Sequence, residues 1–250
     1  MLAIARKKII LQQLREHKSV QITELAEMLQ VTKETIRRDL QAMEQDGHLI
    51  RTHGGAFVLE GVETSLDAST RQALRTAEKE IIAEKCSSII QNGDYVFLDD
   101  STTAFFIAKK LVTRKITVIT NSLDIIDFLA PSSVTGVFAV GGEYDHQDHS
   151  FKGSSAARSL EQYHFDKCFI SCRSVSMDAG MTDSKDDDAI IHHIALTHAH
   201  EKYLAIDNTK LNRSSFSSVA PVSILDGIIM DRPFPMDWTD FLDKNSVKYY

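Results

Sequence analysis

The sequence predicts a small, mostly helical α+β head followed by a larger α/β domain built on a parallel sheet. Residues 3–57 show helical periodicity that ends in a hairpin, with glycines at its tip. From residue 78 onward, helical and strand-like segments alternate, which is typical of a Rossmann-like parallel sheet. A polar, non-periodic stretch separates the two parts. We therefore expect a head at 1–58, a linker at 59–77 and an α/β domain at 78–250.

The composition is that of an ordinary globular protein of one or two domains, with 250 residues, 43% of them hydrophobic. The sequence holds no long apolar run and no signal-peptide pattern, so we expect a cytoplasmic protein without a membrane span. The three cysteines, an odd count, are expected to be reduced thiols.

The charge is unevenly distributed. The net charge is −7, yet residues 1–60 hold 9 Lys and Arg against 8 Asp and Glu, so the remaining residues carry −8. Binding to nucleic acid needs only a local basic face. An acidic total therefore does not exclude it.

The head is predicted to hold three helices. The first spans about 3–17, the second is capped by Thr23, and the third is capped by Thr32. In the third helix, Ile36, Leu40 and Met43 fall at i, i+4 and i+7 and should face the core.

The opposite face of the third helix and the hairpin carry side chains that suit DNA. Arginine, lysine, threonine and glutamine can bind phosphates and base edges, and glycines allow positive φ angles and close approach to a phosphate. For an isolated Arg-Arg pair, a solvated face is the simpler interpretation. The complete succession of helix, turn, helix and hairpin favours DNA binding here. The candidate contacts are Thr32, Lys33, Thr35, Arg37, Arg38, Gln41, Arg51, His53, Gly54 and Gly55.

In the second part, small polar residues follow the expected strands 95–99, 116–120, 136–140, 166–171 and 202–207. Ligands of parallel sheets bind at the carboxyl ends of the strands, and helix N-termini there suit an anion such as phosphate. Each group alone could be only a helix cap or a turn. Together they predict a pocket in which lysine and arginine add charge, and Asp99 or Asp207 accepts from sugar hydroxyls. The candidate ligand contacts are Asp99, Ser101, Thr102, Thr103, Thr120, Asn121, Ser122, Gly141, Gly142, Arg173, Asp207 and Lys210.

Three weaker patterns have simpler explanations than a metal or redox site. The histidines around 192–200 lie on an expected helix 189–200 and should be exposed or at the pocket edge. Cys168 and Cys172 should be buried apolar side chains. Residues 186–188, three aspartates, should form a solvated loop or a helix start. We expect no metal and no cofactor.

The head resembles the DeoR family of bacterial transcriptional regulators. The motifs VTKETIRRDL (31–40) and GHLIRTHGGA (47–56) match the family pattern, with Thr32 in place of the usual serine. The resemblance implies a winged helix-turn-helix with residues 32–44 as recognition helix.

The second part resembles the family's sensor domain, which is related in fold to ribose-5-phosphate isomerase. The matching motifs are LDDSTT (98–103), TNSL (120–123), GG (141–142) and DNTK (207–210). Ser101 replaces a glycine of the family pattern, and the loop after the fourth strand lacks the glycine that relatives usually carry near Arg173. His192-His193 replaces a frequent Lys-Arg pair, which would leave a partly pH-dependent charge.

The resemblance implies a DNA-binding regulator, a repressor of a carbohydrate operon, whose operator affinity is controlled by a phosphorylated sugar or related metabolite. The alternative is a sugar-phosphate isomerase-like enzyme with an accessory DNA-binding head, using Asp99, Asp207 and His192 for proton transfer. We expect a homodimer or higher homo-oligomer, because operators are commonly read by symmetric dimers.

Overall fold

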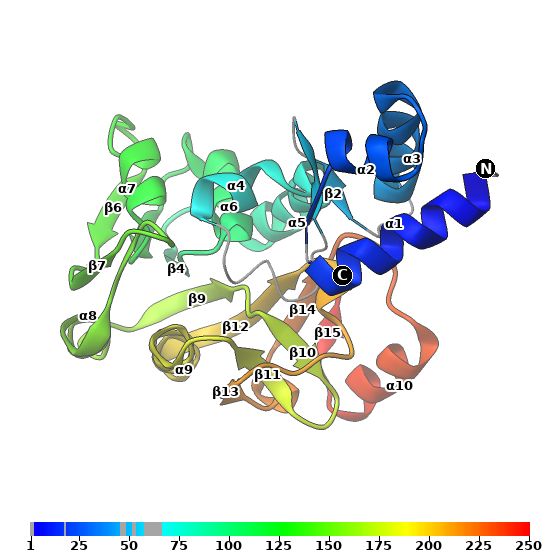
Figure 1. The fold of residues 1–250 in the computed structure, drawn as a ribbon. Coiled ribbons are helices and arrows are strands. Elements are labelled where there is room, and N and C mark those ends of the chain that lie inside the picture. The colour runs from blue at the N-terminus through cyan, green and yellow to red at the C-terminus, as the bar shows by residue number, and fades with distance from the viewer. Residues whose placement is uncertain (1–2, 18, 46–48, 52–53, 58–66) are drawn as a thin grey trace. The chain divides into compact units, whose positions relative to one another are not determined.

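The structure is a computed structural model that describes residues 3–17, 19–45, 49–51, 54–57 and 67–250. The chain divides into two compact units, Met1–Leu66 and Asp67–Tyr250 (Figure 1). The expected order of a mostly helical head and a parallel-sheet α/β domain is confirmed.

The first unit combines three helices with a small antiparallel sheet. Its elements in chain order are α1 (Ala3–His17), β1 (Ser19–Gln21), α2 (Ile22–Met28), α3 (Lys33–Gln45), β2 (Ile50–Arg51) and β3 (Gly55–Phe57). The strands pair in the order β1-β3-β2. Thr23 was expected to cap the second helix, but α2 begins one residue earlier, after Gln21, which makes no side-chain capping bond.

The core of the first unit lies between these helices and the sheet. Ile36, Leu40 and Met43 are fully buried, as their spacing predicts, and they pack with Ile10 and Leu14 of α1. This packing fixes which face of α3 points inward and leaves its polar face exposed.

The second unit is a three-layer α/β fold. Among the described residues, seven parallel strands form the central sheet in the order β15-β14-β12-β9-β4-β5-β6. Their bounds are β4 (Tyr95–Leu98), β5 (Thr117–Thr120), β6 (Gly136–Ala139), β9 (Phe165–Ile170), β12 (Ala199–Ile206), β14 (Gly227–Met230) and β15 (Lys248–Tyr249).

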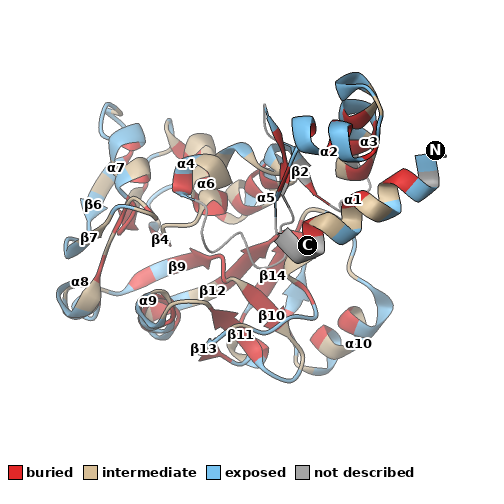
Figure 2. Ribbon diagram, viewed as in Figure 1, coloured by how far each residue is buried: buried red, intermediate tan, exposed pale blue. Residues whose placement is uncertain are grey.

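Residues on alternate positions of these strands enter different hydrophobic layers, because successive side chains of a strand point to opposite faces. Val96 and Leu98 pack with α5 (Thr76–Ile89), α6 (Thr102–Leu111) and α7 (Leu123–Leu129). Phe97 packs in the other layer, with α8 (Gly153–Leu160), α9 (Asp186–His198) and α10 (Met236–Lys244). The central strands are therefore buried on both faces, whereas the edge strands β6 and β15 are largely exposed (Figure 2).

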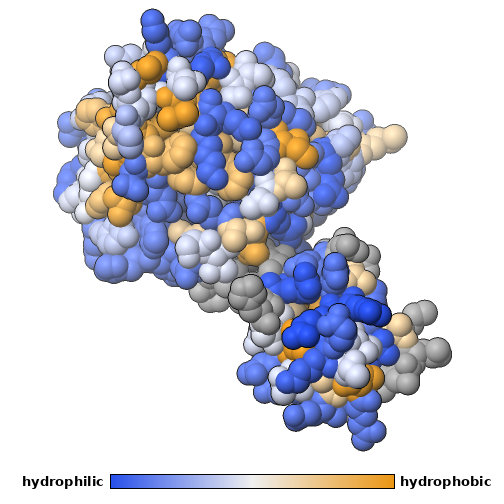
Figure 3. Space-filling model, turned by 90° about the horizontal axis from the view of Figure 1, so that it is seen from above, coloured by the Kyte–Doolittle hydropathy of each residue, from blue (hydrophilic) through white to orange (hydrophobic). Residues whose placement is uncertain are grey.

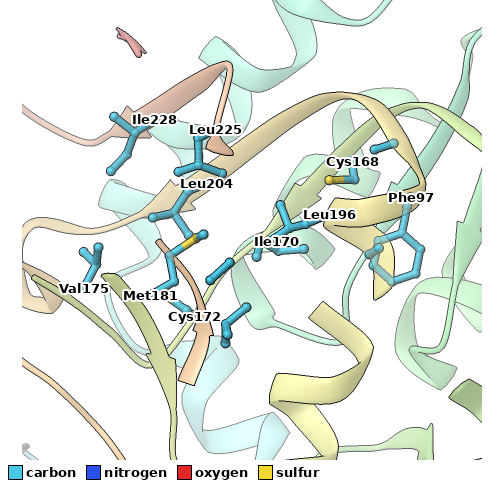
Figure 4. Packing of buried hydrophobic residues seen from close by; sticks show 14 of the residues in the cluster. Phe97, Cys168, Ile170, Cys172, Val175, Met181, Leu196, Leu204, Leu225 and Ile228 are labelled. Carbon is cyan, nitrogen blue, oxygen red and sulfur yellow. The ribbon is translucent and has the colours of Figure 1, made fainter. Parts of the chain in front are cut away.

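The layer around Phe97 also contains two of the cysteines (Figure 4). Cys168 and Cys172 are buried and free, as expected, and burial raises the pKa of each thiol to about 12. Only Cys168 lies on the strand, since β9 ends at Ile170. These thiols fill space in the core.

Several short elements were not predicted from the sequence. They include the hairpin β7 (Glu143–Asp145) and β8 (Ser150–Lys152), and the antiparallel sheet of β10 (Ser174–Ser176), β11 (Gly180–Asp183) and β13 (Ser217–Ala220). The turn helix α4 (Ala68–Ala73) lies within the stretch 59–77 that was expected as a linker. Two 3₁₀ turns, η2 (Asn208–Lys210) and η3 (Val222–Ile224), complete the unit. The helix expected at 189–200 instead begins at Asp186 and ends at His198, so His200 lies on β12.

No helix in the described parts of the chain is both long and apolar enough to span a membrane. On the face seen in Figure 3, hydrophilic side chains predominate and apolar ones lie in patches between them.

Candidate functional sites

The polar face of α3 is open in the first unit. Lys33, Arg38 and Gln41 are exposed, and no carboxylate among the described residues lies within ion-pair distance of Arg38. Arg37 forms an exposed ion pair with Glu34, at 3.3 Å between Nη1 and Oε2. An exposed pair of this kind contributes little to stability and can be exchanged for a phosphate at low cost.

The start of α3 is held by threonines. The Thr35 amide donates to the Thr32 hydroxyl over 3.2 Å, which confirms Thr32 as the capping residue, and the two hydroxyls lie 2.9 Å apart. Both threonines thus have a structural task in addition to any contact with DNA.

The hairpin is tied to α3 through Arg51. Its amide and its Nε donate to the two carboxylate oxygens of Glu44, over 2.9 and 2.8 Å. Arg51 therefore positions β2 against the helix. His53 lies outside the described residues.

The glycines of the hairpin differ from expectation, because neither has a positive φ. A Cβ on Gly55 would lie 2.0 Å from the carbonyl oxygen of Val20, whereas a Cβ on Gly54 would meet nothing within 4 Å. Gly55 is required by the close passage of β1, and not by the turn conformation.

A buried ion pair joins α3 to α1. Arg6 donates from Nη2 to Asp39 Oδ1 over 3.0 Å, and its Nε contacts Oδ2. The acidic residue of the Arg-Arg-Asp run therefore faces inward, while Arg37 and Arg38 face solvent.

In the second unit, the strand order places a topological switch point between β4 and β9. From β4 the chain proceeds to β5 and β6 on one side, and from β9 to β12, β14 and β15 on the other. In open α/β sheets a crevice forms outside the carboxyl ends of the strands at this point. Asp99 follows β4 there, and Ser171 follows β9.

Asp99 connects the two sides of this switch point. It is fully buried, and its oxygens accept from the amides of Ser101, over 3.0 Å, and Ser171, over 2.5 Å. Its Oδ2 also lies 3.1 Å from His192 Nε2. Asp99 was expected to accept a hydrogen bond from a sugar hydroxyl, but in the structure both of its oxygens contact groups of the protein.

Three other candidate residues act as caps. Ser101 Oγ accepts from the Ala104 amide, Ser122 Oγ from the Ile125 amide, and Asp207 Oδ1 from the Thr209 amide. Thr120 Oγ1 accepts from the Ser122 amide over 3.0 Å. The polar loops therefore fix helix starts at the sheet edge. Thr102 is half-buried beside them, and Thr103 is buried.

The loop after β6 approaches the N-terminus of α8. A Cβ on Gly142 would lie 2.5 Å from the carbonyl oxygen of Lys152, so this glycine permits a close contact, while Gly141 is open. Asn121, which follows β5, donates from its side-chain Nδ2 to the Phe151 carbonyl over 3.1 Å. Its buried Oδ1 has no hydrogen-bond partner among the described residues. That oxygen is free to accept a further hydrogen bond.

Cationic side chains gather on the other side of Asp99. Lys210 donates from Nζ to Ser171 Oγ over 2.9 Å. The amide of Arg173 donates to Asp183 Oδ1 over 2.7 Å. Two further cations, Arg75 and Lys79, interact electrostatically with Asp207 and were assigned no role from the sequence. The sequence could have indicated that Lys79 is buried, because it lies on the same helical face of α5 as the apolar residues Ile82, Ala83 and Cys86.

A second group of charges surrounds Lys152, which is buried. Its Nζ lies 2.6 Å from Asp148 Oδ2, 2.5 Å from Asp188 Oδ1 and 3.3 Å from Asp100 Oδ2. One oxygen of each of these three aspartates lies within 4.8 Å of the others, and the Lys152 ammonium group lies among them, while Arg71 and Lys185 also pair with Asp148. Asp188 belongs to the first turn of α9, as a helix start predicts. The sequence could not show this cluster, because its members come from three separated segments.

His192 corrects an expectation. It is buried, not exposed or at the pocket edge, and its Nδ1 lies 2.7 Å from Asp183 Oδ2. Burial alone would lower its pKa, but Asp183 and Asp99 raise the pKa well above 6.5. The imidazolium is thus an internal counter-charge rather than a ligand contact. His193, by contrast, is exposed and bonds the Val219 carbonyl.

Comparisons with known proteins agree with the two-unit organisation. Residues 6–61 match the DeoR-like helix-turn-helix domain, and residues 74–232 match the DeoR C terminal sensor domain. The chain is similar to the lactose phosphotransferase system repressor of Lactococcus lactis subsp. lactis, with 37% identity over 90% of each chain. It is 32% identical to the putative aga operon transcriptional repressor of Escherichia coli O157:H7, over 97% of this chain and 91% of that one.

A solved structure gives a weaker likeness. Ribose 5 phosphate isomerase A from Neisseria gonorrhoeae is 16% identical, with a TM-score of 0.40 over 54% of this chain and 53% of that chain. These values are too low to bear on function.

Proposed function

The chain belongs to the DeoR family of transcriptional regulators, and from this membership we propose that it is a repressor of a carbohydrate operon whose operator affinity is set by a small phosphorylated sugar or related metabolite. The relatives named above are repressors of sugar-related systems by their own names. The assignment of an operon and a ligand class to this chain rests on that similarity.

The observation that carries the DNA-binding function is the two-sided character of α3. Ile36, Leu40 and Met43 anchor one face in the core, while Lys33 and Arg38 stand exposed on the other. A helix fixed in this way can enter a major groove with its basic side chains toward base edges and phosphates. We propose that the helix contacts DNA through Thr32, Lys33, Thr35, Arg37, Arg38 and Gln41. Residues 51–55 would lie along the sugar-phosphate backbone of the DNA.

The ligand site is proposed at the switch point of the parallel sheet. Helix starts after β4 and β5, the cation Lys210 and the vacant acceptor of Asn121 combine anion-binding and hydroxyl-binding groups. This combination suits a sugar that carries a phosphate.

The enzymatic alternative has no comparable support. The proton-transfer groups it would use are Asp99, Asp207 and His192, and all three are buried. His192 lies between Asp99 and Asp183, and Asp207 accepts from the Thr209 amide. Relatives that match nearly the whole chain are named as regulators.

Two finer points remain proposals. A homodimer or higher homo-oligomer would match the two-fold symmetry of an operator. Light scattering of the full-length chain should give at least twice its 28.0 kDa monomer mass. A protein that acts on operator DNA works where the chromosome is, so we propose the cytoplasm.

The DNA-binding function is tested by selecting genomic fragments on the immobilised full-length protein. Enrichment of one region, and loss of that enrichment in Arg38→Ala, is expected. Uniform retention of all fragments would contradict operator recognition.

The ligand is tested separately, by thermal shift with phosphosugars and their unphosphorylated parents. We expect only phosphorylated compounds to raise the melting temperature, and Lys210→Ala and Thr102→Ala to abolish the response while DNA binding is retained. The control is Lys115→Ala, which removes an exposed lysine of the same unit. An unchanged response in Lys210→Ala would refute this pocket.

A further inference from the structure

Lys79 is a buried lysine held by backbone carbonyls. It lies in the first turn of α5 and is only 5% exposed. Its Nζ donates to the carbonyl of Arg71, over 2.5 Å, and to that of Leu74, over 2.8 Å. The first carbonyl belongs to the last turn of α4 and the second to Leu74, the residue that ends this helix. No carboxylate among the described residues lies within ion-pair distance of this Nζ.

The charges that face Lys79 are mostly positive. Burial, the positive charge of Lys210 and those of Arg71 and Arg75 together lower its pKa to about 7, while Asp207 opposes them. Arg71 is paired with Asp148, and Arg232, another cation near Asp207, is paired with Asp231 and also faces Glu78. The cations around Asp207 that have no carboxylate partner of their own in the described residues are then Arg75, Lys79 and Lys210, which we call the cationic trio. A carboxylate faced by three cations leaves a local excess of positive charge that an anion can fill.

The number of N–H donors gives Lys79 a specific property. A charged ammonium group has three donors, whereas a neutral amine has two. The two carbonyls take two donors, so a third donor is available for a ligand only when the side chain is protonated. An anion that bonds to Lys79 therefore stabilises its charged form and makes its bonds to the turn charge-assisted, which strengthens them.

The segment held by Lys79 lies at the beginning of the second unit. The second unit begins at Asp67, which caps α4 through the Thr70 amide. Ala68 donates to the Gln147 carbonyl over 2.8 Å. Arg75, between the two helices, has a φ of 50°, an uncommon conformation for a residue other than glycine and one often found at ligand sites. This segment is the beginning of the second unit in the chain.

We propose that the cationic trio binds the anionic group of the ligand and that Lys79, by taking up a proton with it, stiffens the α4–α5 turn at the point where the chain leaves for the DNA-binding unit. The proposal rests on the proposed function, because it supplies the route from ligand to DNA affinity. It assigns the ligand a dianionic group, such as a phosphate ester, and gives Lys79, besides the anion binding that it shares with Lys210, the separate task of holding the end of α4.

Isothermal titration of the full-length protein with sodium sulfate tests the binding step. Sulfate is a dianion that does not titrate near neutral pH, so any proton uptake comes from the protein. The titrations are repeated in buffers of different ionisation enthalpy, with sodium chloride at the same ionic strength as the reference. Just above pH 7 they should show that the protein takes up protons when sulfate binds. The affinity for sulfate should fall as the pH rises. Lys79→Met should lose the uptake and bind sulfate roughly 10- to 100-fold more weakly, the contribution of a charge-assisted hydrogen bond.

Two further variants separate charge from fold. Lys79→Gln keeps a donor for the carbonyls but has no charge, so it should fold normally and show the same loss. Lys115→Met, which removes an exposed lysine of the same unit, should behave as the unmodified chain.

Hydrogen exchange tests the stiffening. Sulfate should slow exchange of the Arg71 and Leu74 amides, which bond within α4 and the turn, in the unmodified chain but not in Lys79→Met. Sulfate affinity unaffected by Lys79→Met, no saturable binding by the unmodified chain, or exchange that sulfate leaves unchanged would each overturn the proposal. Selection of operator DNA does not depend on any of these results, so failure here is distinguishable from failure of the proposed function.

Discussion

The guanidinium of Arg6 and the carboxylate of Asp39 form a buried ion pair that joins α1 to α3 in the DNA-binding unit. Removing one partner leaves the other charge buried, so Asp39→Ala should destabilise this unit by roughly 1–3 kcal/mol. Urea unfolding followed by circular dichroism measures this loss. Glu34→Ala, which removes the exposed partner of Arg37, should change stability by less than about 0.5 kcal/mol. Equal effects of the two substitutions on the free energy of unfolding would show that the buried pair contributes no more to stability than the exposed one.

The two hairpin glycines should respond differently to alanine. Gly55→Ala places a Cβ against the Val20 carbonyl and should destabilise the first unit by about 2 kcal/mol or more, with loss of β1–β3 pairing. Gly54→Ala has open space and no positive φ, so its effect should stay within about 0.5 kcal/mol. Thermal unfolding of the two variants side by side checks the contrast. A stable Gly55→Ala protein would contradict the close approach of the strands.

Arg38 and Lys33 should contribute to DNA binding in different ways. Arg38→Ala is expected to weaken binding to the selected operator by about 1–3 kcal/mol and to relax sequence preference. Lys33→Ala should weaken operator and unrelated DNA similarly, because a phosphate contact carries no sequence information. Fluorescence anisotropy at one fixed salt concentration, with both DNAs, distinguishes them. Unchanged operator affinity in Arg38→Ala would place the reading face elsewhere.

His192 should make the second unit less stable in alkaline solution. Its pKa is raised on folding, so the stabilisation is fully present below the unfolded value of 6.5 and is lost as the pH rises through the folded value. The stability difference between the unmodified chain and His192→Gln should therefore shrink by up to about 1.4 kcal/mol per pH unit between the unfolded value of 6.5 and the folded value, and stay constant above it. Chemical unfolding from about pH 6 to about pH 9 measures it, with exposed His200→Gln as control. A difference independent of pH would mean that His192 is neutral in the fold.

The sequence predicts what depends on periodicity and local motifs. The i, i+4, i+7 spacing of Ile36, Leu40 and Met43 identified the buried face of α3, and the alternation of segments identified the parallel sheet. The role of His192 could not be predicted from the sequence. Its partners Asp99 and Asp183 lie on other elements, and only folding brings them close to the imidazole.

The unpredicted elements share a physical cause. Strands β10, β11 and β13 are three or four residues long and rich in serine and threonine, so they have no alternating apolar pattern to detect. Lys79 was overlooked for another reason, since a lysine near a helix start is usually solvated. Its position on the stripe of Ile82, Ala83 and Cys86 was the sign that it points inward.

The burial of β4 on both faces has a consequence for how relatives of this chain can diverge. A single inserted residue in that strand would exchange Phe97 with its neighbours between the two layers, so the strand cannot change length without repacking both. The loops that follow the strands are constrained only at particular residues, such as buried Asp99 and closely packed Gly142. Ligand preference can therefore change by substitution at the other loop positions without repacking of the sheet.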